Sequence, residues 1–189
     1  MFQNLTFEYS GNVLGIAGNN GSGKTTLMKC LSFLLRPTNG SLYWEKDGKA
    51  IDAQTLKSMA GYAAPYINLY AELTVKENLT FLLKVNNIPV FERKLDDLLQ
   101  RVQLSELGNQ LFGSLSTGQQ QRTKLAAALV RDPEIIFLDE PGSNLDKKGH
   151  ALVQDIVEET SQHGKMIVLA SNDPHEIDLC DRVIRLTSE

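Results

Sequence analysis

Apolar positions fall into two periodic patterns along the 189-residue chain. Runs that are apolar on both faces are typical of buried strands, and they occur at 13–17, 135–138 and 166–170, with a last strand predicted at 182–186. Between these runs, segments with helical character occur at 27–35, 51–59, 117–130 and 147–161. Because buried strands alternate with helices, the pattern predicts an α/β fold whose mostly parallel core sheet is covered on both sides.

The chain opening follows a different, two-residue period. Residues 2–9 alternate between apolar and polar, which predicts a half-buried strand with Phe2, Leu5, Phe7 and Tyr9 on one face. A turn at 10–12 makes this strand one arm of a hairpin. Turn residues also frame short strands at 41–45 and 61–64. A short antiparallel β edge is therefore expected beside the parallel sheet.

Residues 66–114 have a helical character of their own. Thr74 and Glu77 have the spacing of a capping box, which starts a helix. Apolar residues then repeat at helical spacing, at Leu79, Leu82, Leu83, Leu95, Leu98, Leu99 and Val102. We therefore predict a single domain in which an α/β core, residues 1–65 and 115–189, carries an inserted helical lobe at 66–114.

Composition and charge narrow the possible functions. The hydrophobic share of 42% and charged share of 22% are ordinary for a globular domain, and no apolar run approaches the ~20 residues that cross a bilayer. The first residues lack the pattern of a secretory signal, which predicts a cytoplasmic protein. Cys30 and Cys180 have no ligand-spaced neighbours, so neither a disulfide framework nor a zinc site is expected. A net charge of -4 argues against nucleic acid as the main partner.

The stretch Gly18–Thr26 reads G-N-N-G-S-G-K-T-T and lies between a predicted strand and a predicted helix. This is the context of the phosphate-binding pattern G-x-x-x-x-G-K-[ST]. Its glycines let backbone N–H groups converge on an anion, and the helix directs its positive dipole end at the same point. Lys24 is expected to reach the β- and γ-phosphates, Thr25 to bind Mg²⁺, and Thr26 to contact the α-phosphate. Further predicted contacts come from Asn20, Gly21, Ser22 and Gly23.

Two carboxylates follow the predicted strand at 135–138. The segment reads I-I-F-L-D-E-P, which puts Asp139 and Glu140 at the sheet edge where parallel strands collect ligands. Beside the phosphate-binding loop, Asp139 is expected to hold Mg²⁺ through its waters. Glu140 lies where a base polarises a water molecule aimed at the γ-phosphate. This pair predicts nucleotide hydrolysis.

The segment Leu115–Arg122 reads L-S-T-G-Q-Q-Q-R and resembles the signature motif of the ATP-binding cassette (ABC) ATPases, although Thr117 replaces the usual glycine. Ser143–Asp146 resembles the D-loop of that family, and the motifs follow the family's order over nearly the whole chain. The resemblance implies the P-loop NTPase fold, with ATP and Mg²⁺ bound. It also implies that Ser116, Gly118 and Gln119 contact ATP held by a second cassette, so that two subunits clamp two ATP molecules.

Three positions depart from the family pattern. The glutamine that contacts Mg²⁺ and the attacking water is replaced by Tyr66 or Pro65, and the histidine that contacts the γ-phosphate is replaced by Asn172. Asparagine donates a hydrogen bond but carries no charge, so we expect Asn172 to make the catalytic contact and hydrolysis to be slow. Tyr9 is too close to the loop to stack on adenine. This predicts weak base selectivity or an adenine-binding strand missing before this sequence.

The resemblance implies the ATPase subunit of a membrane transporter, on the inner face of the cell membrane. Expected partners are a second, identical cassette and a separate integral membrane subunit, which alone contacts the membrane, and no nucleic acid. Bacterial exporter cassettes of the cytochrome c biogenesis haem exporter type are the most similar subgroup, with lipid, drug and peptide exporters as other possibilities. The alternatives are a weakly hydrolysing ATP-sensing module and a soluble ABC ATPase acting on nucleic acid or ribosomes. The second fits poorly, because the chain has one cassette and no long coiled coil.

Overall fold

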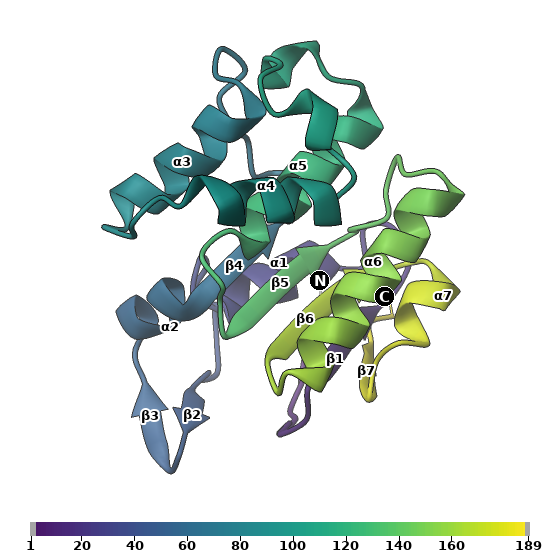
Figure 1. Cartoon of the computed structure of the whole chain (residues 1–189). Helices are drawn as coiled ribbons and strands as arrows, with labels where there is room; N and C mark the ends of the chain where they lie inside the picture. Colours follow the sequence, from purple (N-terminus) through teal and green to yellow (C-terminus); the bar gives the residue numbers. More distant parts are fainter. Residues whose placement is uncertain (1–2, 188–189) are drawn as a thin grey trace.

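A five-stranded sheet forms the centre of the computed structural model, which describes residues 3–187 (Figure 1). The strands lie in the order β4-β5-β6-β1-β7, and every neighbouring pair is parallel. Their bounds are Val13–Ala17 for β1, Ala60–Ala63 for β4, Ile135–Asp139 for β5, Met166–Ser171 for β6 and Arg182–Arg185 for β7. The predicted α/β fold with a parallel core sheet is confirmed.

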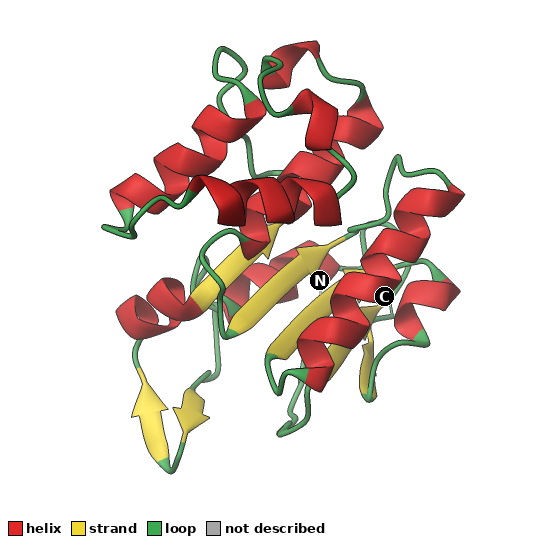
Figure 2. Ribbon diagram, in the orientation of Figure 1, coloured by secondary structure: helices red, strands yellow, loops and turns green. Residues whose placement is uncertain are grey.

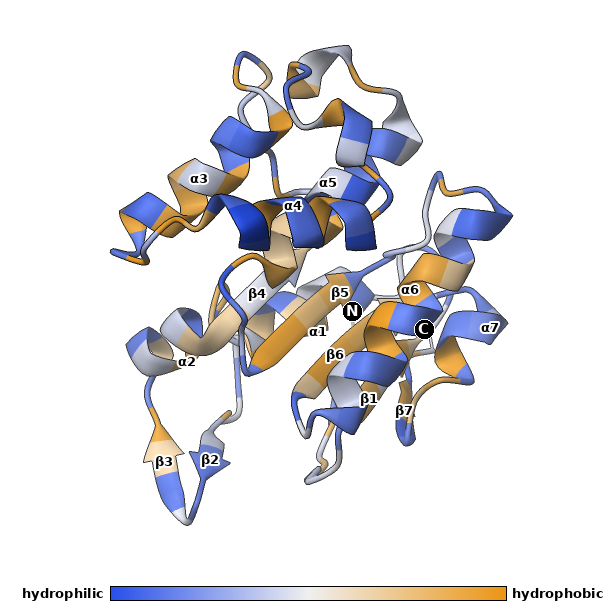
Figure 3. Cartoon of the chain, in the orientation of Figure 1, coloured by the Kyte–Doolittle hydropathy of each residue, from blue (hydrophilic) through white to orange (hydrophobic). Residues whose placement is uncertain are grey.

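Helices cover both faces of this sheet (Figure 2). Alternate strand residues face opposite sides, so Phe137 of β5 packs in an apolar cluster with α1 (Lys24–Leu31), whereas Ile136 packs in a second cluster with other helices. Those helices are α5 (Thr117–Leu129) and α6 (Lys147–Gln162). Every residue of β1 and β5 is buried, and β5 is apolar from Ile135 to Leu138 before it ends in Asp139 (Figure 3). This two-sided burial explains why these segments show no polar alternation.

The helix after the phosphate-binding loop differs from the prediction at both ends. α1 begins at Lys24, inside the loop motif, and ends at Leu31 rather than at residue 35. Ser32 is its C-cap, and the next residue, Phe33, has a φ of 53°, a left-handed value that ends a helix. The apolar residues that extended the predicted helix, Leu34 and Leu35, lie exposed.

The antiparallel edge is formed by β2 (Trp44–Lys46) and β3 (Lys49–Ile51) rather than by the chain opening. Asp47 and Gly48 join these strands with φ values of 52° and 73°, as a tight hairpin turn requires. The predicted strand at 41–45 is therefore shorter and shifted. It includes Trp44, whose indole N–H donates to the Leu31 carbonyl at 2.7 Å.

The predicted opening strand is wrong for the part of the chain that the structure describes, because residues 3–9 form no ladder. Their alternation reflects packing instead: Leu5, Phe7 and Tyr9 are half buried against the apolar cluster on the α1 side of the sheet. The segment is held at its end by Asp181, which accepts hydrogen bonds from the Tyr9 hydroxyl and from the N–H groups of residues 12 and 13. Phe2 lies outside the described residues.

Replacing Asp181 by asparagine should destabilise the protein near neutral pH. Hydrogen bonds, first that of the Val13 N–H, lower the pKa of the Asp181 carboxyl. A lowered folded pKa stabilises the fold above the unfolded value of about 4, and this contribution is lost as the pH falls through the folded value. Because Asp181 is exposed, we expect a loss of about 1 kcal/mol. Thermal unfolding at pH 7 and pH 3 measures this loss of stability, with Asp178→Asn as the control. An equal loss at the two pH values would contradict the prediction.

The segment between β4 and α5 contains α3 (Val75–Val85), α4 (Glu92–Arg101) and 3₁₀ turns at Ser105–Leu107 and Phe112–Ser114. The capping box is present: the Thr74 hydroxyl accepts from the Glu77 N–H at 3.1 Å, and the Glu77 carboxylate accepts from the Thr74 N–H at 2.8 Å. Leucines of α3 and α4 belong to the same apolar cluster as α5, so this segment is packed continuously onto the core. Its limits as a lobe at 66–114 stay a prediction.

The remaining helices are short. α2 (Ala53–Met59) begins after Asp52, whose carboxylate accepts from the Thr55 N–H at 2.7 Å. α7 (Pro174–Ile177) begins after Asp173, which accepts from the His175 N–H at 2.9 Å. Among the described helices, none has the length and apolar character needed to cross a membrane.

Candidate nucleotide-binding site

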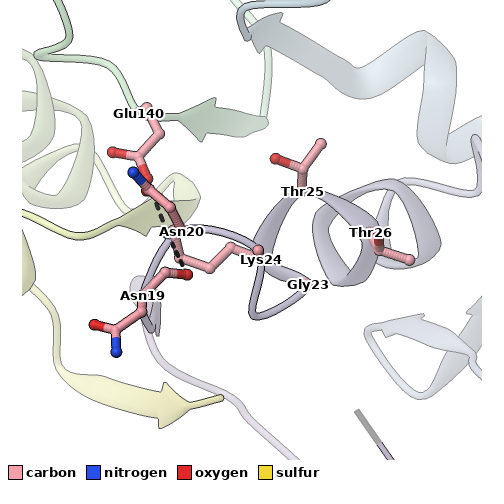
Figure 4. Close-up of a pocket in the computed structure, with 8 residues that line it drawn as sticks. Asn19, Asn20, Gly23, Lys24, Thr25, Thr26 and Glu140 are labelled. Carbon is pink, nitrogen blue, oxygen red and sulfur yellow. Dashed lines mark hydrogen bonds and ion pairs between the residues drawn. The ribbon is translucent and has the colours of Figure 1, made fainter. Parts of the chain in front are cut away.

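The loop between β1 and α1 encloses a cavity of about 380 Å³ at the carboxyl edge of the sheet (Figure 4). Gly21 and Gly23 have φ values of 84° and 100°, which turn successive backbone N–H groups inward. Gly23 is also the N-cap of α1 and offers no side-chain cap, so the first N–H groups of the helix are available to an anion. The cavity is lined by Asn19, Asn20, Gly21, Gly23, Lys24, Thr25, Thr26 and Glu140.

Lys24 is the buried positive charge of this cavity. Its side chain is 6% exposed, and its Nζ donates to the Gly18 carbonyl at 2.7 Å. The same Nζ lies 3.0 Å from Oε1 of Glu140 (Figure 4). The loop lysine and the carboxylate after β5, predicted from separate motifs, are therefore in direct contact. An incoming phosphate would compete with Glu140 for this ammonium group.

Thr25 and Asp139 form a second pair in the same cavity region. The Thr25 hydroxyl donates to Oδ2 of Asp139 at 2.7 Å, while Oδ1 of Asp139 is buried and has no hydrogen-bond partner among the described residues. Burial raises the pKa of the Asp139 carboxyl, the Thr25 hydrogen bond lowers it, and the charge of Glu140 raises it further. Hydroxyl and carboxylate oxygens are ligands that Mg²⁺ prefers. The orphaned oxygen and this donor set fit the predicted cation.

Asn172 completes the group from the end of β6. Its side-chain Nδ2 donates to Oδ1 of Asn20 in the loop at 3.2 Å, and its N–H donates to Oε2 of Glu140 at 3.4 Å. Glu140 itself has a φ of 49° and donates its N–H to the Ala170 carbonyl at 2.8 Å. A left-handed glutamate is uncommon, and here β6 holds it in place. The ends of β1, β5 and β6 thus bring three predicted segments together.

The signature residues lie elsewhere on the chain and do not line this cavity. Ser116 is exposed and caps α5: its Oγ accepts from the Gln119 N–H at 3.3 Å, and its N–H donates to Gln119 Oε1 at 2.9 Å. Gly118 is half buried, and a Cβ at this position would lie 3.1 Å from the Asn144 carbonyl of the D-loop segment. The motif therefore presents its helix start at the surface of the molecule.

Tyr66 is one of the two residues, with Pro65, expected at the position of the family's glutamine, and this assignment stays a prediction. Its hydroxyl is buried without a hydrogen-bond partner in the described chain, and Lys29 Nζ lies 4.1 Å from the centre of its ring. Burial raises the pKa of Tyr66 to about 12, and the nearby Asp139 charge contributes to the rise. Sequence reasoning missed Lys29, although it stands four residues after Thr25 and therefore on the same face of α1.

Comparison with known proteins extends these observations. Residues 2–143 match the family model described as ABC transporter. The ABC transporter ATP-binding protein NatA of Bacillus subtilis is 31% identical over 188 residues, which cover 97% of this chain and 76% of NatA. The daunorubicin resistance ATP-binding protein DrrA3 of Streptomyces coeruleorubidus is 34% identical over 176 residues, 92% of this chain and 56% of DrrA3.

The chain spans only part of some relatives. It is 32% identical over 177 residues to ABC transporter A family member 1 of Dictyostelium discoideum, which covers 92% of this chain but 20% of that protein. This relative and DrrA3 therefore extend well beyond the region that they share with this chain.

Solved structures of one bacterial ABC transporter cassette, MJ0796, share the fold. Its dimeric structure superposes with a TM-score of 0.82 at 26% identity, over 94% of this chain and 82% of that chain. Its dimeric post-hydrolysis state, bound to ADP and Pi, gives a TM-score of 0.82 at 27% identity over the same shares. Together with the family match and the meeting of the phosphate-binding loop with the residues that end β5 and follow β6, these similarities establish that the chain belongs to the ABC transporter family and has the fold of its ATP-hydrolysing cassettes.

Proposed function

We propose that this chain is the ATP-binding and ATP-hydrolysing subunit of a membrane transporter. The observation that carries the proposal is the meeting of Lys24, Thr25, Asp139, Glu140 and Asn172 at one sheet edge. Each group has the chemistry that phosphoryl transfer to water requires: a cation for the phosphates, oxygens for a metal, a carboxylate base and a polar donor.

The contacts within the site suggest the order of events. Phosphates entering the loop attract Lys24 away from Glu140, because the lysine Nζ contacts both the loop carbonyl and Oε1 of Glu140. This frees the Glu140 carboxylate to accept a proton from the attacking water. Thr25 and Asp139 would hold Mg²⁺, which when bound shields the phosphate charge. Asn172, already hydrogen-bonded to Asn20 of the loop, is placed to donate to the γ-phosphate.

The exposed signature residues supply the second part of the proposal. Ser116 and the start of α5 present donors and a dipole end at the surface, outside the chain's own cavity. We propose that Ser116, Gly118 and Gln119 of one copy contact ATP held in the loop of another. The dimeric structures of the similar MJ0796 cassette support this arrangement. Dimer closure would then drive a separate integral membrane subunit on the inner face of the cell membrane.

The test is ATP-dependent dimer formation. In the Glu140→Gln background, where hydrolysis is blocked, we expect a dimer with Mg-ATP and a monomer without nucleotide, measured by sedimentation velocity. Adding Ser116→Arg should prevent the dimer while leaving ATP binding to the loop intact, because a bulky cation replaces the small phosphate donor. Ser58→Arg, at an exposed serine of α2, is the matched control. A persistent monomer that still binds ATP would contradict the transporter mechanism and favour the sensing module.

A second candidate function is a weakly hydrolysing ATP-sensing module. Tyr66 and Asn172 favour it, because both replace polar groups that the resemblance assigns to hydrolysis. The narrower resemblance to haem exporter cassettes gains no support from the relatives described above. DrrA3 is named for daunorubicin resistance rather than for haem export. We therefore propose no cargo for this chain.

A further inference from the structure

A second group of potential ligands joins the start of α6 to α7. His150 lies in the first turn of α6, Asp173 caps α7, and Glu176 lies within α7. His150 Nδ1 is 3.7 Å from Oδ2 of Asp173 and 3.9 Å from Oε1 of Glu176. One ligand atom from each residue lies within 4.8 Å of the other two. The nucleotide mechanism described above uses none of these three side chains.

Glu176 is the member of this group with a carboxylate oxygen that lacks a partner. The residue is 5% exposed, and its Oε1 makes no hydrogen bond among the described residues. This is the oxygen that faces His150. Burial raises the pKa of the Glu176 carboxyl, and the charges of Asp173 and Glu140 raise it further, whereas Ser171 and His150 lower it. A buried carboxylate oxygen without a donor is costly, and a bound cation would remove that cost.

Gly142 keeps space open between the ligand atoms. A Cβ at this position would lie 2.2 Å from Oε1 of Glu176 and 2.8 Å from Nδ1 of His150, so a larger residue would collide with both. Zinc–ligand bonds of about 2.0–2.2 Å imply ligand separations of about 3.3–3.6 Å in a tetrahedral site. The two separations from His150, 3.7 and 3.9 Å, require shifts of a few tenths of an ångström, and the ligand atoms of Asp173 and Glu176 lie within 4.8 Å of each other. Asp173 uses Oδ1 to cap α7, which leaves Oδ2 for an ion.

We propose that His150, Asp173 and Glu176 bind a divalent transition-metal ion of the zinc type, at a site separate from the Mg²⁺ expected at Thr25 and Asp139. One imidazole and two carboxylates are a ligand set that Zn²⁺ accepts, with water in the fourth position. The site connects α6 to the residue that directly follows Asn172. A bound ion would therefore hold the segment after Asn172 against the start of α6.

The test is metal binding by the nucleotide-free protein in excess Mg²⁺. Zn²⁺ titrated by calorimetry should bind with one ion per chain, and Co²⁺ should give the visible absorption bands of a low-symmetry four-coordinate site. His150→Ala and Glu176→Gln should each weaken Zn²⁺ binding more than about tenfold and abolish the Co²⁺ bands. His175→Ala, at the exposed histidine next to Glu176, is the matched control and should bind as the unaltered protein does.

Three outcomes would overturn the proposal. If the unaltered protein binds no stoichiometric Zn²⁺, or if His150→Ala binds Zn²⁺ as tightly as the His175→Ala control, the cluster is a histidine–carboxylate ion pair only. A thiolate-to-Co²⁺ charge-transfer band would place the ion at a cysteine instead and would equally overturn the site. Far-ultraviolet circular dichroism verifies the fold of each variant, and Glu176→Gln tests the site should His150→Ala fail to fold.

Discussion

The Glu140→Gln variant should bind ATP and lose almost all turnover. Glutamine keeps the size and hydrogen-bonding shape of glutamate but cannot accept the proton of the attacking water. A positioned general base contributes about 10²–10⁴-fold, so kcat for phosphate release should fall by about that factor. The 3.0 Å contact between Glu140 and Lys24 is also lost as an ion pair, which leaves the lysine free for the nucleotide. Steady-state phosphate release and ATP binding, measured on the same preparation, separate the two effects.

Glu134→Gln is the matched control for this change. Glu134 directly precedes β5, whereas Glu140 directly follows it, and Glu134 pairs with Lys46 at the surface. The control should keep the turnover of the unaltered protein. A Glu140→Gln rate within about tenfold of the control would show that Glu140 is not the base.

Combining Asn172→His with Tyr66→Gln should raise ATP turnover. Histidine at 172 can donate a charged hydrogen bond to the γ-phosphate, and such a bond is worth about 1–2 kcal/mol more than a neutral one. Glutamine at 66 would place an amide near Asp139, where the buried Tyr66 hydroxyl now lacks a partner. Because about 1.4 kcal/mol corresponds to tenfold, we expect kcat to rise on the order of tenfold.

The single variants and His175 control this experiment. Each single change should raise kcat less than the pair, since one group is expected to act on the γ-phosphate and the other on Mg²⁺ and the attacking water. His175→Asn removes the exposed histidine three residues after Asn172 and should leave turnover unchanged, which would show that His175 does not supply the missing histidine. A double variant that hydrolyses ATP no faster than the unaltered protein would remove the reason for predicting slow hydrolysis.

The phosphate-binding loop and the parallel strands were predictable because their signals are local. The glycines at 21 and 23 indicate positive φ values, which both residues have. The apolar runs of β5 and β6 indicate burial on both faces of the sheet. The capping boxes at Thr74 and Ser116 also depend on residues three positions apart, and the structure has both. Local signals failed at residues 3–9, where the alternation reflects packing rather than a strand, and at 32–35, where the left-handed Phe33 ends the helix although apolar residues continue.

The sequence by itself determined the loop, the carboxylates after β5 and the signature helix, because each is encoded within a few neighbouring residues. Only the tertiary structure decided that Lys24 contacts Glu140, that Asn172 reaches Asn20, and that the Lys29 ammonium lies over the Tyr66 ring. These contacts join segments far apart in the chain, and side-chain pairs of that kind leave no periodic trace. For the same reason, no pattern in the sequence indicated that His150 and Glu176 lie close together, although α6 and α7 bring them into contact.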